Sequence, residues 1–197
     1  MTYTEFQYRL LNSRCTNCDL YKTRRNIVGS RGNPSAPVML IGEAPGAEED
    51  ATGKPFVGTS GQVLDEMLYF IGIDPAKDIL VTNIIHCRPP EDRKPKTKEV
   101  SACESWLLKE IRIMKPKFIV GLGGTACEWL AKRKVPMNGF AGKLFGMSEF
   151  PHFDWPWVEK IGFMYHPAAL LYDETLKPTA LEHWKKFKLE VARCLNR

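Results

Sequence analysis

The sequence lacks any apolar run long enough to cross a membrane. No segment approaches the roughly 18 consecutive apolar residues of a transmembrane helix, and the N-terminal stretch MTYTEFQYRLLNSR has no apolar signal-peptide core. Internal repeats, low-complexity tracts and linker-like segments are also absent. These absences favour a cytoplasmic protein with no membrane partner, folded as one domain over residues 1–197.

Cysteine is sparse, with six in 197 residues, and a cytosolic setting disfavours disulfides. Cys15 and Cys18 form a C-x2-C pair, and Cys87 and Cys103 follow much later in the chain. Four thiolates suit either a tetrahedral zinc ion or a [4Fe–4S] cluster. Zinc sites often use two C-x2-C pairs, and Cys87 and Cys103 are too far apart to form one. The spacing therefore favours the cluster over zinc.

Charge of either sign is modest overall, since the formal net charge is only +5. The cations nevertheless gather around the cysteines: Arg14, Lys22, Arg24 and Arg25 near the first pair, and Arg88, Arg93, Lys94, Lys96 and Lys98 near the second. A cofactor held by both groups would bring these nine cations into one patch. Such a patch permits a polyanionic partner without requiring one.

Short apolar runs separated by helical patterns predict an α/β fold. The expected buried strands are 38–41, 79–84, 118–121 and 161–164. Expected helices include one around Leu64 to Ile71, one capped by Thr97, a short one over 125–132 and a terminal one over 176–195. This alternation is typical of a three-layer α/β/α domain with a central, mainly parallel, four-stranded sheet.

Ligands of such sheets bind beyond the carboxyl ends of the strands. Glu43 follows the first expected strand, Asn83 ends the second, and His166 follows the fourth. After the third strand comes Gly121-Leu122-Gly123-Gly124, which lacks a full dinucleotide fingerprint and is interpreted as strand-to-helix packing. A carboxylate, an amide and an imidazole are thus expected at one edge of the sheet.

Three motifs carry a resemblance to a known family. GEAPGAEEDATGKPFVGTSGQVL at 42–64, VTNIIHCRPPEDRKP at 81–95 and HPAALL at 166–171 resemble the signatures of the family 4, iron–sulfur uracil-DNA glycosylases. The four cysteines complete the family's cluster pattern, and the likeness covers nearly the whole chain. It implies a glycosylase fold, excision of uracil from DNA in base excision repair, and a [4Fe–4S] cluster on Cys15, Cys18, Cys87 and Cys103.

The resemblance also implies roles for pocket residues. Glu43, Ala44 and Pro45 would line the uracil and water pocket, while Phe56 would stack on the base. Asn83 would read the edge of a flipped-out uracil, since its amide offers both a donor and an acceptor. His166 would face uracil O2 and, with main-chain N–H groups of the first motif, stabilise the developing anion.

Several assignments stay open at the level of sequence. Glu43 would stabilise the sugar cation or orient the attacking water, and Glu49 would handle water or fill the space of a thymine methyl. Leu170 or Leu171 would wedge into the gap left by the flipped nucleotide. Tyr172 stands where family members often carry arginine, and the aromatic stretch around Trp155–Trp157 is either a DNA-facing hairpin or a packing surface.

The expected partner is uracil-containing DNA, single- or double-stranded, bound by a monomer, and replication or repair proteins are further candidate partners. One rival function is a non-catalytic, glycosylase-fold module that binds DNA or accompanies a polymerase. The Glu43, Asn83 and His166 set argues against it, because a binder would not need all three. A zinc-ribbon-like nucleic-acid binder is the second rival.

Overall fold

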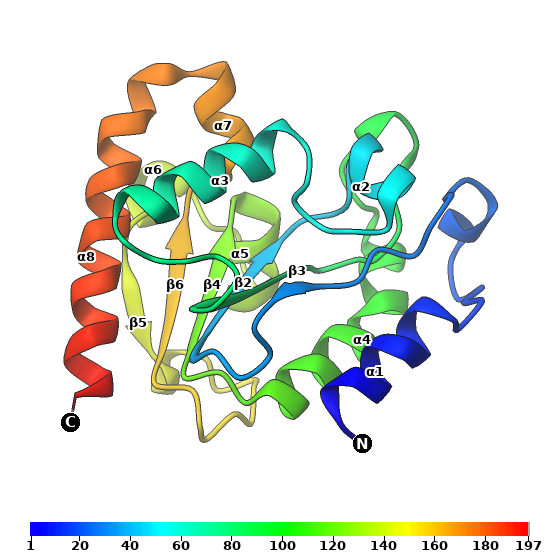
Figure 1. Ribbon diagram of the computed structural model, residues 1–197, viewed down its shortest axis with the longest axis horizontal. Coiled ribbons are helices and arrows are strands. Elements are labelled where there is room, and N and C mark those ends of the chain that lie inside the picture. The colour runs from blue at the N-terminus through cyan, green and yellow to red at the C-terminus, as the bar shows by residue number, and fades with distance from the viewer. Residues whose placement is uncertain (197) are drawn as a thin grey trace.

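A six-stranded sheet organises the computed structural model, which describes residues 1–196 (Figure 1). The strands are β1 (Arg31–Gly32), β2 (Val38–Gly42), β3 (Ile79–Asn83), β4 (Phe118–Leu122), β5 (Leu144–Gly146) and β6 (Lys160–Met164). Their order is β1-β3-β2-β4-β6-β5. The four inner strands run parallel, and the two outer strands pair antiparallel with their neighbours.

The inner strands are the four that the sequence predicts, and the expected four-stranded sheet is wrong only in its count. β1 and β5 contain two and three residues. Both are too short to form a recognisable apolar run, and neither is buried on both faces as β2, β3 and β4 are. The periodic signal that reveals a central strand is therefore missing at both edges.

Helices cover both faces of the sheet among residues 1–196. They are α1 (Tyr3–Leu11), α2 (Ala47–Thr52), α3 (Thr59–Phe70), α4 (Thr97–Met114), α5 (Gly124–Ala131), α6 (Met137–Phe140), α7 (Pro167–Tyr172) and α8 (Lys177–Leu195). Thr97, the expected cap of α4, is instead its first residue. Lys96 holds the cap position, and its main-chain N–H donates to the Glu99 carboxylate at 2.7 Å.

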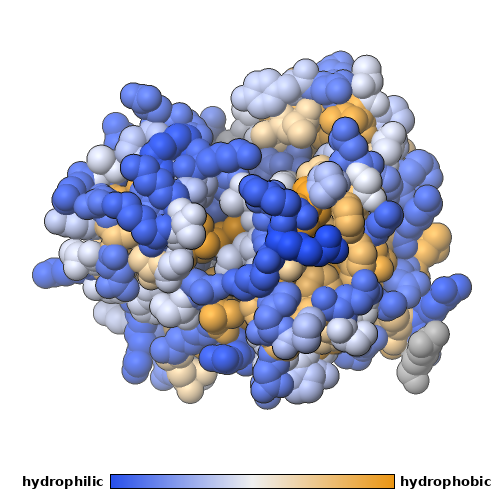
Figure 2. All heavy atoms as spheres, turned by 180° about the vertical axis from the view of Figure 1, so that it is seen from behind, coloured by the Kyte–Doolittle hydropathy of each residue, from blue (hydrophilic) through white to orange (hydrophobic). Residues whose placement is uncertain are grey.

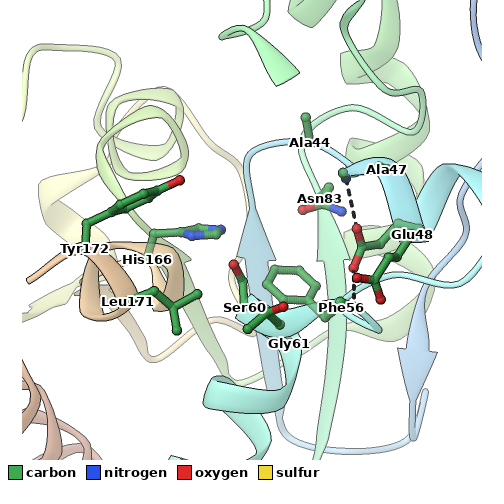
Figure 3. A pocket seen from close by; sticks show the side chains of 14 residues that line it. Ala44, Ala47, Glu48, Phe56, Ser60, Gly61, Asn83, His166, Leu171 and Tyr172 are labelled. Carbon is green, nitrogen blue, oxygen red and sulfur yellow. Dashed lines mark hydrogen bonds between the residues drawn. The ribbon is translucent and has the colours of Figure 1, made fainter. Parts of the chain in front are cut away.

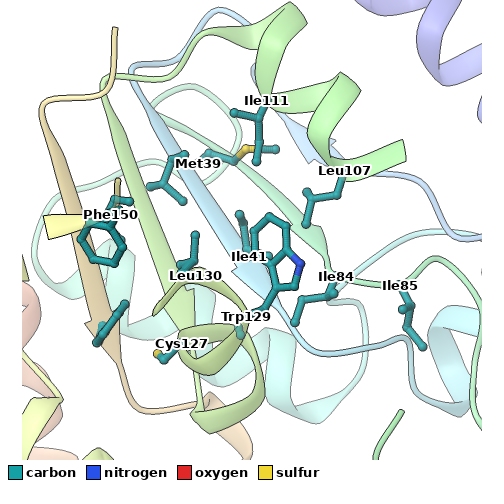
Figure 4. Close-up of a cluster of buried hydrophobic side chains, with 14 of the residues drawn as sticks. Met39, Ile41, Ile84, Ile85, Leu107, Ile111, Cys127, Trp129, Leu130 and Phe150 are labelled. Atoms are coloured by element: carbon teal, nitrogen blue, oxygen red, sulfur yellow. The ribbon is translucent and has the colours of Figure 1, made fainter. Parts of the chain in front are cut away.

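Side chains of the strands point alternately to the two faces of the sheet and join two separate hydrophobic cores. The sheet and the helices on its two faces form three layers. Met39 and Ile41 of β2 join a cluster with side chains from α4 and α5 (Figure 4). Val38 and Leu40 point to the other face, into a cluster with side chains from α3 and α8. Each strand residue thus buries its apolar side chain against one helical layer. Such burial stabilises the fold by roughly 25 cal/mol for each Å² of apolar surface removed from water. The predicted three-layer α/β/α fold is confirmed.

The aromatic segment before β6 is a packing surface, one of the two alternatives that the sequence left open. Trp155 is 2% exposed, and its ring stacks on Phe153 with centroids 3.9 Å apart. Both rings also lie against Trp129 of α5. The aromatic content of this stretch therefore enlarges the core instead of presenting bases with a stacking surface.

Polar side chains dominate one face of the molecule. Figure 2 shows one face on which hydrophilic residues cover most of the molecule and apolar groups are visible mainly between them. No helix within residues 1–196 is both long and apolar enough to span a bilayer.

Candidate active site

A cavity of about 560 Å³ opens at the carboxyl edge of the sheet (Figure 3). Side chains from four regions line it: the α2 segment, the loop into α3, the end of β3 and the start and end of α7. Phe56, Asn83 and His166 are all among them. The prediction that side chains following separate strands meet at one edge is therefore confirmed for Asn83 and His166.

Asn83 contributes a buried polar group that lacks a partner. It is 3% exposed, and its Oδ1 has no hydrogen bond to any described residue. Leaving such an acceptor buried and unpaired costs on the order of 1–3 kcal/mol. An unsatisfied acceptor in a cavity wall indicates a ligand that brings its own N–H or O–H donor.

Glycine at position 42 makes room for this arrangement. Gly42 ends β2 and lies in register with Asn83 on β3. A Cβ atom at Gly42 would come within 2.5 Å of both Asn83 Oδ1 and the Phe56 ring. The absence of a side chain there lets the amide and the aromatic ring share one pocket.

Phe56 is held in a conformation that few residues adopt. Its φ is 52°, in the left-handed region, and its side chain is 7% exposed. Gly61 of α3 permits this, because any Cβ at Gly61 would collide with the main chain of Phe56. Backbone strain of this kind persists only where the surrounding structure enforces it, and it is common at functional sites. The ring lies 6.1 Å from that of His166, at an interplanar angle of 34°.

His166 caps the N-terminus of α7 with its ring. Its Nδ1 accepts a hydrogen bond from the Ala168 main-chain N–H at 3.2 Å. The proton of the neutral imidazole is therefore on Nε2, which is free to act as a donor. Burial lowers the pKa of His166 to about 4, and nearby Glu49 opposes that shift only in part. The ring is thus neutral at physiological pH.

Glu49 braces the wall of the cavity. Its Oε1 accepts from the N–H groups of Val57 and Gly58 at 2.9 and 2.8 Å, and its Oε2 accepts from Gly46 N–H at 3.0 Å. These main-chain donors belong to the first motif, whose N–H groups were expected to face the anion. In this conformation the three are turned to Glu49 instead, and sequence pattern gave no signal of it.

A second cavity of about 270 Å³ adjoins the first and shares Ala44, Gly46 and His166 with it. Glu43 and Pro45 line this second cavity only. Of Glu43, Ala44 and Pro45, which were expected to line the uracil and water pocket, Ala44 alone therefore lines the larger cavity. Glu43 thus shares the second cavity with His166 and does not line the cavity that Phe56 and Asn83 share.

Arg93 also lines the second cavity, and sequence reasoning counted it only as one of nine cations. Its guanidinium nitrogens donate to both carboxylate oxygens of Glu99 at 2.7 and 2.9 Å. The Glu99 side chain is 1% exposed. A two-point ion pair with a buried partner fixes the guanidinium in place.

The two leucines of the terminal motif lie in different environments. Leu170 is 1% exposed, so its side chain is not available as a DNA wedge while α7 is folded. Leu171 is 40% exposed and lines the rim of the larger cavity, as does the neighbouring Tyr172. Of the two candidate wedges, the structure presents only Leu171 to a ligand.

The four cysteines come from three parts of the fold. Cys15 and Cys18 precede a 3-10 turn at Asp19–Lys22, Cys87 follows β3, and Cys103 lies in α4. Burial and the neighbouring thiols raise the pKa of Cys87 to about 11 and that of Cys103 to about 12. The thiols are therefore electrostatic neighbours, although within residues 1–196 no three His, Cys, Asp or Glu side chains form a group that could hold a metal ion.

Arg24 joins two of the thiol segments and is a basic neighbour of the kind that stabilises thiolates. Its Nη1 lies 3.5 Å from Cys87 Sγ, and its Nη2 donates to the Cys15 carbonyl at 2.7 Å. Farther along the same loop, the main-chain N–H groups of Arg25 and Asn26 donate to the Asp50 carboxylate of α2. The cysteine loop is thereby tied to the helix that borders the cavity.

Comparison with known proteins matches residues 30–188 to the uracil DNA glycosylase superfamily. The chain belongs to this superfamily. A type-4 uracil-DNA glycosylase of Archaeoglobus fulgidus is 36% identical over 176 residues, covering 87% of this chain and 85% of the relative. The type-4 enzyme of Thermotoga maritima is also 36% identical, over 89% of this chain and 88% of its own length.

A more distant match is a DNA polymerase of Bacillus phage SP01. It is 28% identical over 61% of this chain and 13% of the polymerase. The similarity to the type-4 glycosylases covers a far larger share of both sequences. The resemblance drawn from the three sequence motifs is therefore confirmed.

Proposed function

We propose that this protein is a DNA repair glycosylase that flips uracil out of DNA and hydrolyses its N-glycosidic bond, leaving an abasic site. One observation carries the proposal: a buried, unpartnered amide oxygen on Asn83 faces a cavity whose walls also hold Phe56 and His166. An aromatic face, an amide and a neutral imidazole match the π-face, the N3–H and O4 edge, and the O2 of uracil.

Recognition of the base rests on the Asn83 amide. Its Oδ1 would accept from uracil N3–H, and its Nδ2 would donate to O4. Cytosine presents an acceptor at N3 and a donor at N4, so both contacts would be mismatched. The unpaired Oδ1 is then satisfied by the correct base alone. The Phe56 ring would replace part of the stacking that the base loses on flipping, on the order of 1–3 kcal/mol.

Bond cleavage places negative charge on uracil and positive charge on the sugar. His166 is suited to the anion, because its Nδ1 accepts from a main-chain N–H and its Nε2–H is therefore the ring's hydrogen-bond donor. Glu43 lines the adjoining cavity, which His166 also lines, and its carboxylate would orient the water or stabilise the sugar cation. Glu49 would act indirectly, by holding the loop that carries Phe56.

The four cysteines would hold a [4Fe–4S] cluster. Their thiols are electrostatic neighbours, and Arg24 lies beside one of them, which fits a site for thiolates. When bound, the cluster supplies a covalent cross-link among the N-terminal loop, the segment after β3 and α4. Its role is structural in this proposal, since no cysteine among residues 1–196 lines the larger cavity.

The partner would be uracil-containing DNA, bound by residues 1–197 as one monomeric glycosylase domain. Basic residues near the cysteines would contact phosphates, which position the strand without reading its sequence. The intact Glu43, Asn83 and His166 set favours catalysis over a purely binding role.

The direct test is release of free base from matched oligonucleotides that contain uracil, cytosine or thymine at one position. We expect the purified protein to release uracil only and to leave an alkali-labile abasic site. DNA binding without uracil release would instead support the non-catalytic, polymerase-associated alternative. Iron and sulfide analysis on the same sample should return about four of each per chain, and stoichiometric zinc in anaerobically purified protein would exclude the cluster.

A further inference from the structure

Tyr172 is a large aromatic residue left almost entirely in solvent beside the cavity. Its side chain is 91% exposed, the highest value among the exposed large apolar residues of the described chain. It lines the rim of the larger cavity together with Leu171. Figure 3 shows its ring above His166, with the hydroxyl directed over the cavity. We propose that Tyr172 stacks on an unpaired base next to the flipped uracil, and so strengthens binding to single-stranded uracil-DNA.

The position of Tyr172 is set by α7, the helix that His166 caps. α7 begins directly after His166, whose ring caps it, and ends at Tyr172. Leu170, 1% exposed, anchors the helix in the fold, and α7 packs against α3. The backbone of Tyr172 is therefore held at a fixed offset from His166, at the rim of the space for the uracil, while its ring stays exposed. Phe56 occupies the inside of that space, so the two aromatic faces serve different bases.

The charges around this rim favour a base over a phosphate as the partner of Tyr172. Among the described residues, no lysine or arginine lines the larger cavity. Asp173 and Glu174 directly follow Tyr172, and both are exposed. Lys177, in α8, forms a 2.8 Å ion pair with Glu174, so this nearby cation is already engaged with a carboxylate. A rim with an aromatic ring and carboxylates favours the face of a base over the backbone.

A preference for single-stranded over duplex DNA follows from the state of the neighbouring base before binding. In a duplex that base is already paired and stacked, so little is gained by moving it onto Tyr172. In a single strand it is free, and stacking on an aromatic side chain is tolerant of sequence. The contribution of Tyr172 should therefore be larger on single strands than on duplexes.

This inference rests on the proposed glycosylase function, and the test separates the two. Wild type is first assayed for uracil release, whose absence would refute the glycosylase function itself. Dissociation constants are then measured with non-hydrolysable 2′-fluoro-deoxyuridine in single-stranded and duplex oligonucleotides. The variants are Tyr172→Ala, Tyr172→Phe and, as matched control, Tyr8→Ala, an exposed tyrosine of α1 outside the cavity.

We expect Tyr172→Ala to weaken single-strand binding by about 5- to 100-fold, the range for loss of one base–aromatic stack. Tyr172→Phe should bind like wild type, and duplex binding should change less than single-strand binding. A 2-aminopurine placed beside the uracil should be quenched by wild type and by Tyr172→Phe, but less by Tyr172→Ala.

Three results would overturn the inference. One is a Tyr172→Ala affinity within twofold of the Tyr8→Ala control on single strands. Another is an equal loss in Tyr172→Phe, which would assign the effect to the hydroxyl. The last is an equal loss on single strands and duplexes, which would remove the strand preference.

Discussion

The cavity and the cysteine region are assembled by different means. At the cavity, backbone geometry places the groups: Gly42 makes space for Asn83 and Phe56, and the His166 ring is locked as a helix cap. At the cysteine region, side chains from three segments lie near one another without forming a group that could hold a metal ion among residues 1–196. The cavity is thus positioned by the protein's own packing, whereas the cysteine region, if the proposed cluster binds there, would depend on that cluster to join its segments.

Replacing a proposed cluster ligand should have the largest effect of all, a loss of both the cofactor and the stability of the cysteine region. We expect Cys87→Ser to lose its iron and to unfold at a lower temperature, because the N-terminal loop, the end of β3 and α4 lose their cross-link. Cys194→Ser, in α8, is the matched control and should keep its iron. Iron content and thermal melting measure both effects, and an unchanged iron content in Cys87→Ser would contradict the ligand assignment.

Removal of the imidazole should damage the cavity alone. His166→Ala is expected to lower the single-turnover rate of uracil release by about 10²–10³, the usual cost of losing one donor to a developing anion. Iron content and binding of uracil-DNA should change little. Rates within twofold of wild type would show that another group carries the charge, and a mere loss of affinity would make His166 a binding residue.

Adding one methyl group at Gly42 tests the claim that backbone geometry makes the pocket. In Gly42→Ala the new Cβ would collide with both Asn83 Oδ1 and the Phe56 ring. Overpacking of this kind costs about 1–3 kcal/mol of folding free energy, and displacement of the Asn83 amide and the Phe56 ring should abolish most uracil release. Gly139→Ala, where a Cβ would have no neighbour within 4 Å, is the control. Denaturant unfolding and excision assays are the measurements.

The smallest expected effect is on the pH dependence of stability. Burial lowers the pKa of His166 to about 4, while the unfolded chain titrates near 6.5. Between these values the unfolded state binds more protons, so the free energy of unfolding should fall as pH falls from about 6.5 towards 4. His166→Gln should show a shallower fall than wild type over about pH 5 to 7. Identical slopes would contradict the buried, neutral imidazole.

Sequence predicted the parts of the molecule that depend on long apolar runs or on motifs. The four inner strands are continuous apolar segments, and their ends correctly placed Asn83 and His166 at one edge. β1 and β5 were missed because two or three residues at a sheet edge leave no periodic pattern. The short helix α7 was also missed, and with it the rotation that buries Leu170 and exposes Leu171.

The orientation of the carboxylates in the site could not be predicted from the sequence, for a related reason. Glu49 has the residue type of a catalytic carboxylate, yet its oxygens accept from three main-chain N–H groups. Glu43 follows a strand as expected but lines the adjoining cavity. Which way a loop carboxylate turns depends on local hydrogen bonds, and these are not encoded in spacing.

The central claim is that the Asn83 amide, placed by the backbone, reads uracil. The most direct measurement compares single-turnover release of uracil and of cytosine by wild type and by Asn83→Asp. Wild type should release uracil only. In Asn83→Asp a carboxylate would face O4, so uracil release should fall while cytosine, which offers a donor at that edge, gains relative to it. Unchanged uracil excision by Asn83→Asp, with no gain for cytosine, would show that another group reads the base.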